Sequence, residues 1–186
     1  MKSKWNTVPL RALVGYISKG IAPSYSEAKS NSTISVLNQK CNRNFRISYE
    51  EARLHDTAKK KVPLERLLID ADILINSTGA GTAGRIAQID QVPTATTVDG
   101  HMIILRSNGI VTQKYLGYAL KAHQHEVLQL DEGSTGQTEL NRERLLDEIM
   151  ICYPDSLEQQ EAIVRLLESI DQKIVVNTDI NDNLAA

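Results

Sequence analysis

Aromatic side chains are scarce in this chain of 186 residues, which has one Trp, one Phe and six Tyr. Its core is therefore expected to be mainly aliphatic. No run of about twenty apolar residues occurs, which argues against a transmembrane helix, and the opening Met-Lys-Ser-Lys-Trp lacks the apolar stretch of a signal peptide. We therefore expect a cytoplasmic protein with one domain and an appendage.

Cysteine is also rare. The two that are present, Cys41 and Cys152, are far apart and in no metal-ligand spacing, which indicates free thiols in a reducing compartment. The four histidines show no ligand pattern with these cysteines. Neither a Ser-His-Asp order nor a phosphate-binding loop with its lysine is found. The sequence thus predicts no catalytic residues and no metal site.

Neither sign of charge dominates the whole chain, because the net charge is −2, but the charges are unevenly distributed. Residues 1–66 contain 13 Lys and Arg against 5 Asp and Glu, a balance of +8. Residues 67–149 and 150–186 each have a balance of −5. A basic first third favours one surface that faces a polyanion such as DNA. The alternative is a solvated face whose sign varies by chance.

A long helix is predicted from Ser156 to Leu184, a stretch without Gly or Pro. Pro154 ends a strand-like run before it, and Ser156 with Gln159 forms a capping-box pattern. At 1.5 Å per residue the helix would be roughly 40 Å long. It should therefore project well beyond a domain whose radius of gyration is about 15 Å.

An apolar seam with heptad spacing runs along one side of this helix. Its members are Ile163, Leu166, Leu167, Ile170, Ile174, Asn177, Ile180 and Leu184. Such a seam needs a partner, so we predict that these residues mediate dimerisation and that Asn177 restricts the register. The alternative is an amphipathic helix that folds back on its own domain.

The remaining sequence predicts an α+β fold with a mixed or antiparallel sheet. Strands are expected at 33–37, 73–75, 85–89, 94–98, 102–105 and 148–153. Thr112 is a candidate N-cap of a helix, and a short helical turn is expected at 141–146. Thr7 is a plausible N-cap in a short structured opening segment. We predict one globular domain at 1–150 and a helical spacer at 151–186.

Gly79, Gly81 and Gly84 match the dinucleotide-binding pattern G-x-G-x-x-G, but their context does not. A dinucleotide site requires a helix that begins in this loop, whereas residues 85–89 look like another strand. We therefore favour a tight turn whose glycines allow close approach to a phosphate backbone. A nucleotide-binding enzyme that uses this loop is kept as an alternative.

Six segments together resemble one protein family. They are 5–10, 19–25, 72–85, 133–140, 154–163 and 170–174. In this order and spacing they are similar to one target recognition domain plus one conserved helical region of a type I restriction–modification specificity subunit. The resemblance covers essentially the whole chain.

This resemblance implies a non-catalytic DNA reader. Full-length members carry two recognition domains, which are spaced by two long antiparallel helices, and each domain reads one half of a split site. The helices also dock methyltransferase subunits, and a restriction subunit can join them. S-adenosylmethionine, ATP and Mg are expected on those partners, and no cofactor on this chain.

The chain matches only one domain and one helix of that arrangement, about half a subunit. We therefore expect a homodimer that pairs through the C-terminal helix. Two-fold symmetry would then require a palindromic split site in double-stranded DNA. A truncated interaction fragment that does not read DNA itself is the alternative.

Candidate DNA-binding residues follow from side-chain chemistry alone, because recognition loops vary within the family. Base or backbone contacts are expected from Asn42, Arg43, Asn44 and Arg46, with Lys40 beside them. Phosphate contacts are expected from Lys19, Lys59, Lys60 and Lys61. Weaker candidates are Thr78, Thr82, Arg85, Ser134, Thr135 and Gln137; the last three could equally fasten the domain to the helix or touch the methyltransferase.

Overall fold

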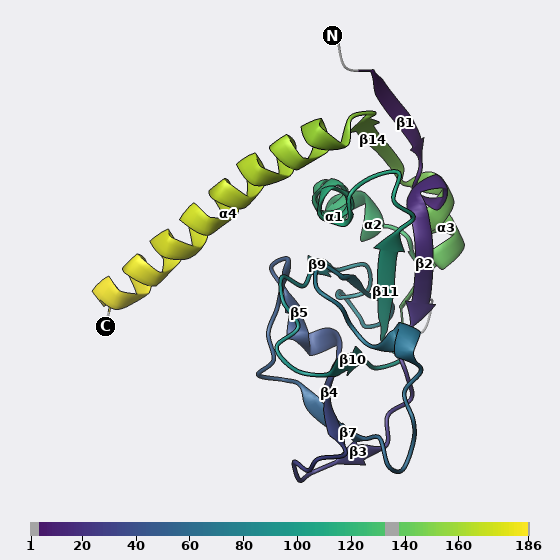
Figure 1. The fold of residues 1–186 in the computed structure, drawn as a ribbon, viewed down its shortest axis with the longest axis vertical. Coiled ribbons are helices and arrows are strands. Elements are labelled where there is room, and N and C mark those ends of the chain that lie inside the picture. Colours follow the sequence, from purple (N-terminus) through teal and green to yellow (C-terminus); the bar gives the residue numbers. More distant parts are fainter. Residues whose placement is uncertain (1–3, 133–137, 186) are drawn as a thin grey trace.

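The computed structural model describes residues 4–132 and 138–185. It has a mixed α+β body, residues 4–132 and 138–154, and one long helix, α4 (Leu157–Ala185), that leaves the body at its upper end and projects away from it (Figure 1). This is the predicted fold class. No helix within the described ranges is long and apolar enough to cross a membrane.

The first of two four-stranded sheets is antiparallel, with the order β2-β11-β8-β9. Its strands are β2 (Val14–Lys19), β11 (Met102–Ser107), β8 (Ile73–Asn76) and β9 (Ile86–Gln88). All four residues of β8 are buried. Successive side chains of a strand point to opposite faces, so Ile73 and Ile75 enter one core cluster while Leu74 enters the other. The predicted aliphatic runs thus form a central strand covered on both faces.

The second sheet is mixed and has the order β10-β4-β7-β3. Its strands are β10 (Thr96–Val98), β4 (Thr33–Leu37), β7 (Arg53–Asp56) and β3 (Tyr25–Ser26). β10 pairs parallel with β4, while β7 pairs antiparallel with β4 and β3. Asp56, the last residue of β7, pairs with Thr33, the first residue of β4. The loop after Asp56 lies at the lower end of the body (Figure 1).

A buried ion pair fastens the segment that connects the two sheets. The guanidinium of Arg106 in β11 donates to the Asp72 carboxylate at 2.7 and 2.8 Å and to the backbone oxygens of Glu65 and Leu67. Glu65 lies within the 3₁₀ helix η3 (Leu64–Arg66), and Leu67 follows that helix directly. The side chain of Asp72 is 1% exposed, so the pair is shielded from solvent and ties the η3 segment to the first sheet.

Helices α1 (Gln113–Ala122), α2 (Gln124–Val127) and α3 (Arg142–Glu148) complete the body. The Thr112 hydroxyl accepts from the Tyr115 amide, so the predicted N-cap is confirmed. The Asn141 side chain caps α3 in the same way by accepting from Arg144 N at 3.0 Å. The short helix expected at 141–146 is therefore present.

The predicted N-cap at Thr7 is wrong, because Thr7 lies within strand β1 (Trp5–Pro9). β1 pairs antiparallel with β14 (Met150–Pro154), and Thr7 faces Cys152. A single 3₁₀ turn, η1 (Leu10–Leu13), follows. Pairing with a strand about 145 residues later overrides the local helix-start signal, and a local pattern cannot reveal such a partner.

Helix α4 begins as predicted, with the Ser156 hydroxyl accepting from Gln159 N at 3.4 Å. Gln160 and Val164 are buried against the body, where the Gln160 side chain accepts from Thr112 N and donates to Pro154 O. From Val176 onward every described side chain of α4 is exposed. The helix is thus fixed at its start and projects freely at its end.

Candidate nucleic-acid interface

A short hairpin presents the strongest candidate residues. Strands β5 (Asn42–Arg43) and β6 (Arg46–Ile47) are joined by the two-residue turn Asn44-Phe45. Both turn residues have positive φ, 51° and 60°, which is the conformation of a tight type I′ hairpin. Arg43 and Arg46 face each other across the strands and are exposed. Among the described residues neither takes part in an ion pair, so both guanidinium groups can contact a ligand.

Asn42 does not belong to this exposed set, contrary to the prediction. It is 0% exposed, and its Nδ2 donates to Arg85 O at 2.9 Å and to Asn76 Oδ1 at 3.2 Å. The Asn76 amide in turn donates to Gln39 O. Because side chains alternate along a strand, Asn42 points inward where Arg43 points outward. Asn42 therefore anchors the hairpin to β8 and β9, and its side chain is not presented at the surface.

The glycine-rich segment forms the predicted tight turn. Gly79, Gly81 and Gly84 have φ values of 115°, 66° and 84°, which favour glycine. The turn joins β8 to β9, and these strands are antiparallel. No helix begins in the loop, so the backbone amides of a dinucleotide-binding helix N-terminus are not formed.

The weaker candidates around this turn are partly engaged within the protein. Thr78 Oγ1 lies 2.7 Å from His101 Nδ1, and Thr82 Oγ1 donates to Thr78 O at 3.4 Å. The Arg85 guanidinium donates to Gly81 O at 3.3 Å and remains partly exposed. The hydrogen bond from Asn42 to Arg85 O places this turn beside the hairpin, so the two predicted segments lie together.

A third predicted segment meets the same turn. Ser134, Thr135 and Gln137 lie outside the described residues, but Thr138 O accepts from Gly79 N at 3.1 Å. Glu139 forms an isolated antiparallel bridge with Thr78 and an ion pair with Lys19. The charge of Lys19 is therefore already partly compensated within the body.

The lysine cluster at 59–61 lies elsewhere. It comes after β7, at the lower end of the body and next to the first residue of β4 (Figure 1). The hairpin comes after the last residue of β4, at the opposite end of that strand. The Lys60 ammonium donates to Ala22 O at 2.8 Å, and Lys59 lies 3.9 Å from the Asp56 carboxylate. Lys61 is exposed, as is Lys40 in the 3₁₀ helix η2 (Gln39–Cys41) beside the hairpin. Of the predicted lysines, Lys40 thus lies in the element that directly precedes the hairpin.

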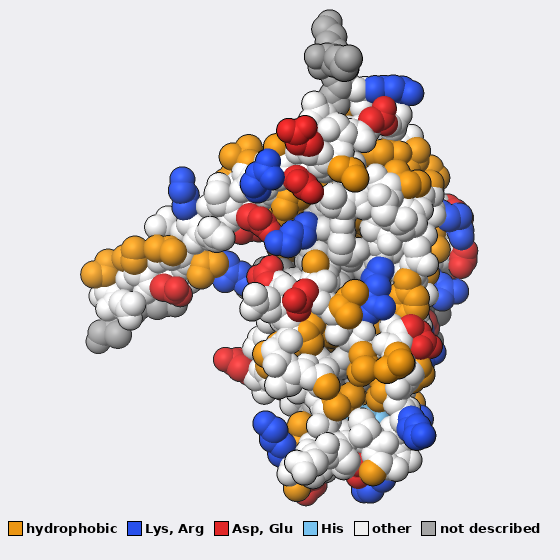
Figure 2. Space-filling view, in the orientation of Figure 1, with side chains coloured by type: hydrophobic (Ala, Val, Ile, Leu, Met, Phe, Trp, Pro, Cys, Tyr) orange, Lys and Arg blue, Asp and Glu red, His pale blue; other side chains and the backbone are white. Residues whose placement is uncertain are grey.

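The basic first third does not produce one continuous basic patch on the face shown in Figure 2, where acidic and basic side chains are interspersed. Several basic residues are paired with acidic residues from later in the chain. Arg11 contacts Glu143 and Asp147, at 2.7 and 2.6 Å. The folded chain therefore offsets part of the charge asymmetry seen along the sequence.

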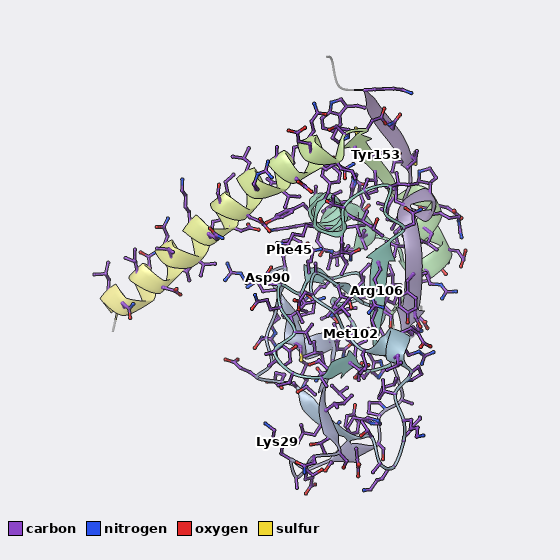
Figure 3. The ribbon with its side chains drawn as sticks, in the orientation of Figure 1. Lys29, Phe45, Asp90, Met102, Arg106 and Tyr153 are labelled. Carbon is purple, nitrogen blue, oxygen red and sulfur yellow. The ribbon has the colours of Figure 1, made fainter. Side chains whose placement is uncertain are left out.

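A groove that the sequence did not reveal lies between the hairpin, β9, α1 and α4. Its volume is about 950 Å³, and its lining includes Phe45, Arg46, Gln88, Lys121 and Asp171. Phe45 extends from the hairpin into the angle between the body and α4 (Figure 3), where the Lys121 ammonium lies 5.2 Å from its ring centre. These residues come from segments up to about 130 positions apart, so only the fold brings them together. Among the described residues, no group of three or more His, Cys, Asp or Glu could hold a metal ion.

The predicted dimer seam is exposed over most of its length. Leu166, Ile170, Ile174, Ile180 and Leu184 have 47–80% of their surface exposed, and Figure 2 shows apolar side chains along the free end of α4. Asn177 is exposed among them, whereas Leu167 is half-buried.

Ile163 needs a correction, because it packs partly against the core of its own body. The first half of α4 folds back on the body through one face while a second face stays open. The alternative of a folded-back helix thus describes part of α4.

Together these features define a small α+β domain with an exposed arginine hairpin and a projecting helix whose apolar seam is uncovered. The sequence matches the family model "Type I restriction modification DNA specificity domain" over residues 2–186. The chain belongs to this family of DNA specificity domains. No relative was found among curated protein sequences.

Solved structures share the fold at low sequence identity. The S subunit of a type I restriction-modification system from M. genitalium has 15% identity and a TM-score of 0.63 over 92% of this chain and 40% of that one. The HsdS subunit from Thermoanaerobacter tengcongensis has 17% identity and a TM-score of 0.59, with 92% and 38% covered. A chain from a structure on complex assembly and conformational transition of the type I R-M system has 17% identity and a TM-score of 0.65, with 95% and 40% covered. The chain thus spans about two fifths of the length of these proteins.

Proposed function

We propose that this chain is a non-catalytic, sequence-specific DNA reader of a type I restriction–modification system. The observation that carries the proposal is the β5–β6 hairpin on a specificity-domain fold, with Arg43 and Arg46 exposed and unpaired among the described residues. The buried Asn42 holds the base of this hairpin to the central sheet. A rigid support of this kind lowers the entropy cost of ordering the hairpin on DNA.

The hairpin chemistry suits base reading in the major groove. An arginine can donate two hydrogen bonds to guanine, and an asparagine can pair in the same way with adenine. Arg43, Asn44 and Arg46 are therefore proposed to contact base edges or the adjacent backbone. Lys40, Lys59, Lys60 and Lys61 are proposed to contact phosphates, which position the protein without reading sequence. Lys19 is a weaker candidate because of its ion pair with Glu139.

We further propose that two copies pair through the exposed seam of α4. Isolated apolar side chains on a surface need no explanation, but a row of them along a projecting helix is typical of helix pairing. Each copy would then read the same half-site, so the target would be a palindrome interrupted by a gap.

Methyltransferase and restriction subunits are the proposed partners, in the cytoplasm. They would carry S-adenosylmethionine, ATP and Mg, while this chain would hold no cofactor. Support comes from the family and from the fold shared with subunits of such systems.

The hairpin is tested with the variant Arg43→Ala/Arg46→Ala in the full chain. We expect weaker DNA binding and, if both residues contact phosphates, a salt dependence whose slope falls by about two, because each phosphate contact contributes roughly one unit. Arg142→Ala is the matched control, since Arg142 is an exposed arginine on α3. Fluorescence anisotropy at several salt concentrations measures both quantities. Binding that stays at the level of the unaltered chain would remove the hairpin from the interface.

A complementary experiment addresses the whole assignment. The chain is co-expressed with a methyltransferase subunit, and modified bases are mapped in the host genome. A split palindromic motif supports the proposal, whereas co-purification without any modified motif indicates an interaction fragment that does not read DNA. Calorimetry with NAD, ATP and S-adenosylmethionine should show no binding to the chain alone, and micromolar binding would favour a nucleotide-dependent enzyme.

A further inference from the structure

A set of polar contacts joins α1 to the middle of α4. Lys114, Tyr118 and Lys121 lie on one face of α1 at i, i+4 and i+7, opposite Glu168 and Asp171 on one face of α4. The Asp171 carboxylate accepts from the Tyr118 hydroxyl at 3.0 Å and from the Lys121 ammonium at 3.0 and 3.1 Å. Lys114 forms an ion pair with Glu168. We call these five residues the α1–α4 clamp.

Asp171 is the centre of the clamp. Its side chain is 37% exposed and that of Lys121 33%, so the pair is only partly shielded from solvent. Burial and the hydrogen bond to Asp171 raise the pKa of Tyr118, which keeps its hydroxyl protonated as a donor. Three donor–acceptor contacts on one carboxylate restrict rotation of α4 about its axis as well as its tilt.

The clamp also lies close to the point where α4 becomes free. Val175 lines the groove one turn further on, and the described side chains from Val176 onward are exposed. Towards the start of α4, Gln160 and Val164 hold the helix to the body. The angle at which the free half leaves the body is therefore set between the contacts of Gln160 and Val164 and those of Asp171.

The clamp reaches the hairpin as well. Lys121 lies 5.2 Å from the ring centre of Phe45, at the tip of the β5–β6 turn. One lysine thus contacts both the proposed reading element and the proposed spacer helix. The hairpin and α4 are held in a defined relation across the groove.

We propose that the α1–α4 clamp fixes the angle between the body and α4, and thereby sets the length of the gap between the two half-sites that a dimer reads. This inference rests on the proposed DNA-reading dimer. Asp171, Tyr118 and Lys121 act as positioning residues and need not touch DNA.

A small rotation is enough to matter. A point about 15 Å from the clamp, roughly the radius of gyration of the body, moves about 4 Å when the body rotates by about 15°. Successive base pairs are about 3.4 Å apart along DNA. Loosening the clamp should therefore change the preferred gap by about one base pair for each body.

The first experiment measures the angle itself in the full chain. Spin labels are placed at Lys29→Cys, at the lower end of the body (Figure 3), and at Asn181→Cys near the end of α4, after Cys152→Ser removes the exposed native thiol. Excess unlabelled protein limits the signal to distances within one copy. Asp171→Lys should broaden or shift the distance distribution, because it opposes Lys121 with a like charge.

Two further variants separate positioning from general destabilisation. The charge swap Asp171→Lys/Lys121→Asp should restore the narrow distribution of the unaltered chain. Glu161→Lys is the matched control, because Glu161 lies on the same helix and pairs only with Arg165 of that helix among the described residues. If Asp171→Lys fails to fold, Tyr118→Phe removes one donor without a charge change and should broaden the distribution less.

The second experiment measures the gap by DNA binding to split palindromes whose gap varies one base pair at a time. The unaltered chain should prefer one gap, Asp171→Lys should shift or widen that preference by about one to two base pairs, and the swap should restore it. An unchanged distance distribution and gap preference in Asp171→Lys would overturn the inference. If the unaltered chain binds no split site, the proposed function fails, while the spin-label distances still decide whether the clamp sets the angle.

Discussion

At the residue scale, single polar side chains decide which parts of this surface can meet DNA. Arg43 and Asn42 are neighbours, yet one is exposed and the other is 0% exposed. Both side chains have hydrogen-bonding chemistry suited to bases, so chemistry alone could not separate them. They differ because side chains alternate between the two faces of a strand. Which of the two faces outward depends on the register of the hairpin, which the sequence alone does not give.

Asn42→Ala is therefore predicted to destabilise the protein. The change removes the hydrogen bonds to Arg85 O and Asn76 Oδ1. Arg85 O keeps its hydrogen bond from Asn76 N, but the buried Asn76 Oδ1 loses its donor, which costs about 1–3 kcal/mol. Urea denaturation followed by circular dichroism measures the loss. Arg43→Ala, on the outward face of the same strand, should stay within about 0.5 kcal/mol of the unaltered chain. Equal stability of the two variants would contradict the anchoring role.

Asp99 leads to a prediction about pH. It is 5% exposed, and burial raises its pKa above the ordinary value, although its carboxylate accepts from His101 N. A carboxyl whose folded pKa is raised costs stability once it ionises, and that cost disappears below its unfolded pKa of about 3.9. Asp99→Asn keeps an acceptor for His101 N and should be more stable than the unaltered chain at pH 7.

This difference between Asp99→Asn and the unaltered chain should shrink as the pH falls through the raised pKa of Asp99 and should be lost below about 4. Chemical denaturation between pH 7 and pH 3.5 provides the comparison. Asp179→Asn, at an exposed position of α4, controls for loss of a negative charge. A less stable Asp99→Asn at pH 7 would show that the ionised carboxylate contributes more than its burial costs.

At the element scale, α4 has two faces with different roles. Gln160, Val164 and Asp171 hold the body, whereas Leu166, Ile170 and Ile174 are open to solvent. Successive residues of a helix turn by about 100°, so the two rows lie about a third of a turn apart. Ile163 lies close to both faces, which explains why heptad spacing alone assigned it to the seam.

Leu166→Glu/Ile170→Glu therefore tests pairing without disturbing the contacts between α4 and the body. Both side chains are exposed in the single chain, so the body should keep its stability, while two buried charges per copy should prevent dimerisation. Analytical ultracentrifugation should show monomers. Gln172→Glu, an added charge on the opposite side of α4, should leave the dimer intact. A dimer that survives the double change would require another interface.

At the scale of the whole molecule, the sequence predicted the parts better than their assembly. The aliphatic runs of β8 and β11, the Thr112 cap and the start of α4 are local patterns, and all are found in the structure. The β1–β14 pair and the groove between the hairpin and α4 join segments more than 100 residues apart. Periodicity within a window cannot reveal such contacts, which is why Thr7 was misassigned.

The molecule should also show two levels of protection against hydrogen exchange. Amides of β8 and β11 lie in the core and should exchange slowly at any protein concentration. The described side chains of 176–184 are exposed in one copy, so the protection of these amides should rise with concentration as copies pair. Mass spectrometry of exchange at two concentrations measures both. Concentration-independent exchange at 176–184 would argue against pairing through this segment.

The pairing of β1 with β14 also orders events during synthesis. At about 5–20 residues per second, β1 waits roughly 7–30 s before its partner strand is made. The body can close only then, and the apolar seam of α4 is translated after the strand that closes it. In each nascent chain the surface that would join it to another copy is therefore made after the strand that closes its own body, and this order favours folding of the body before pairing of copies.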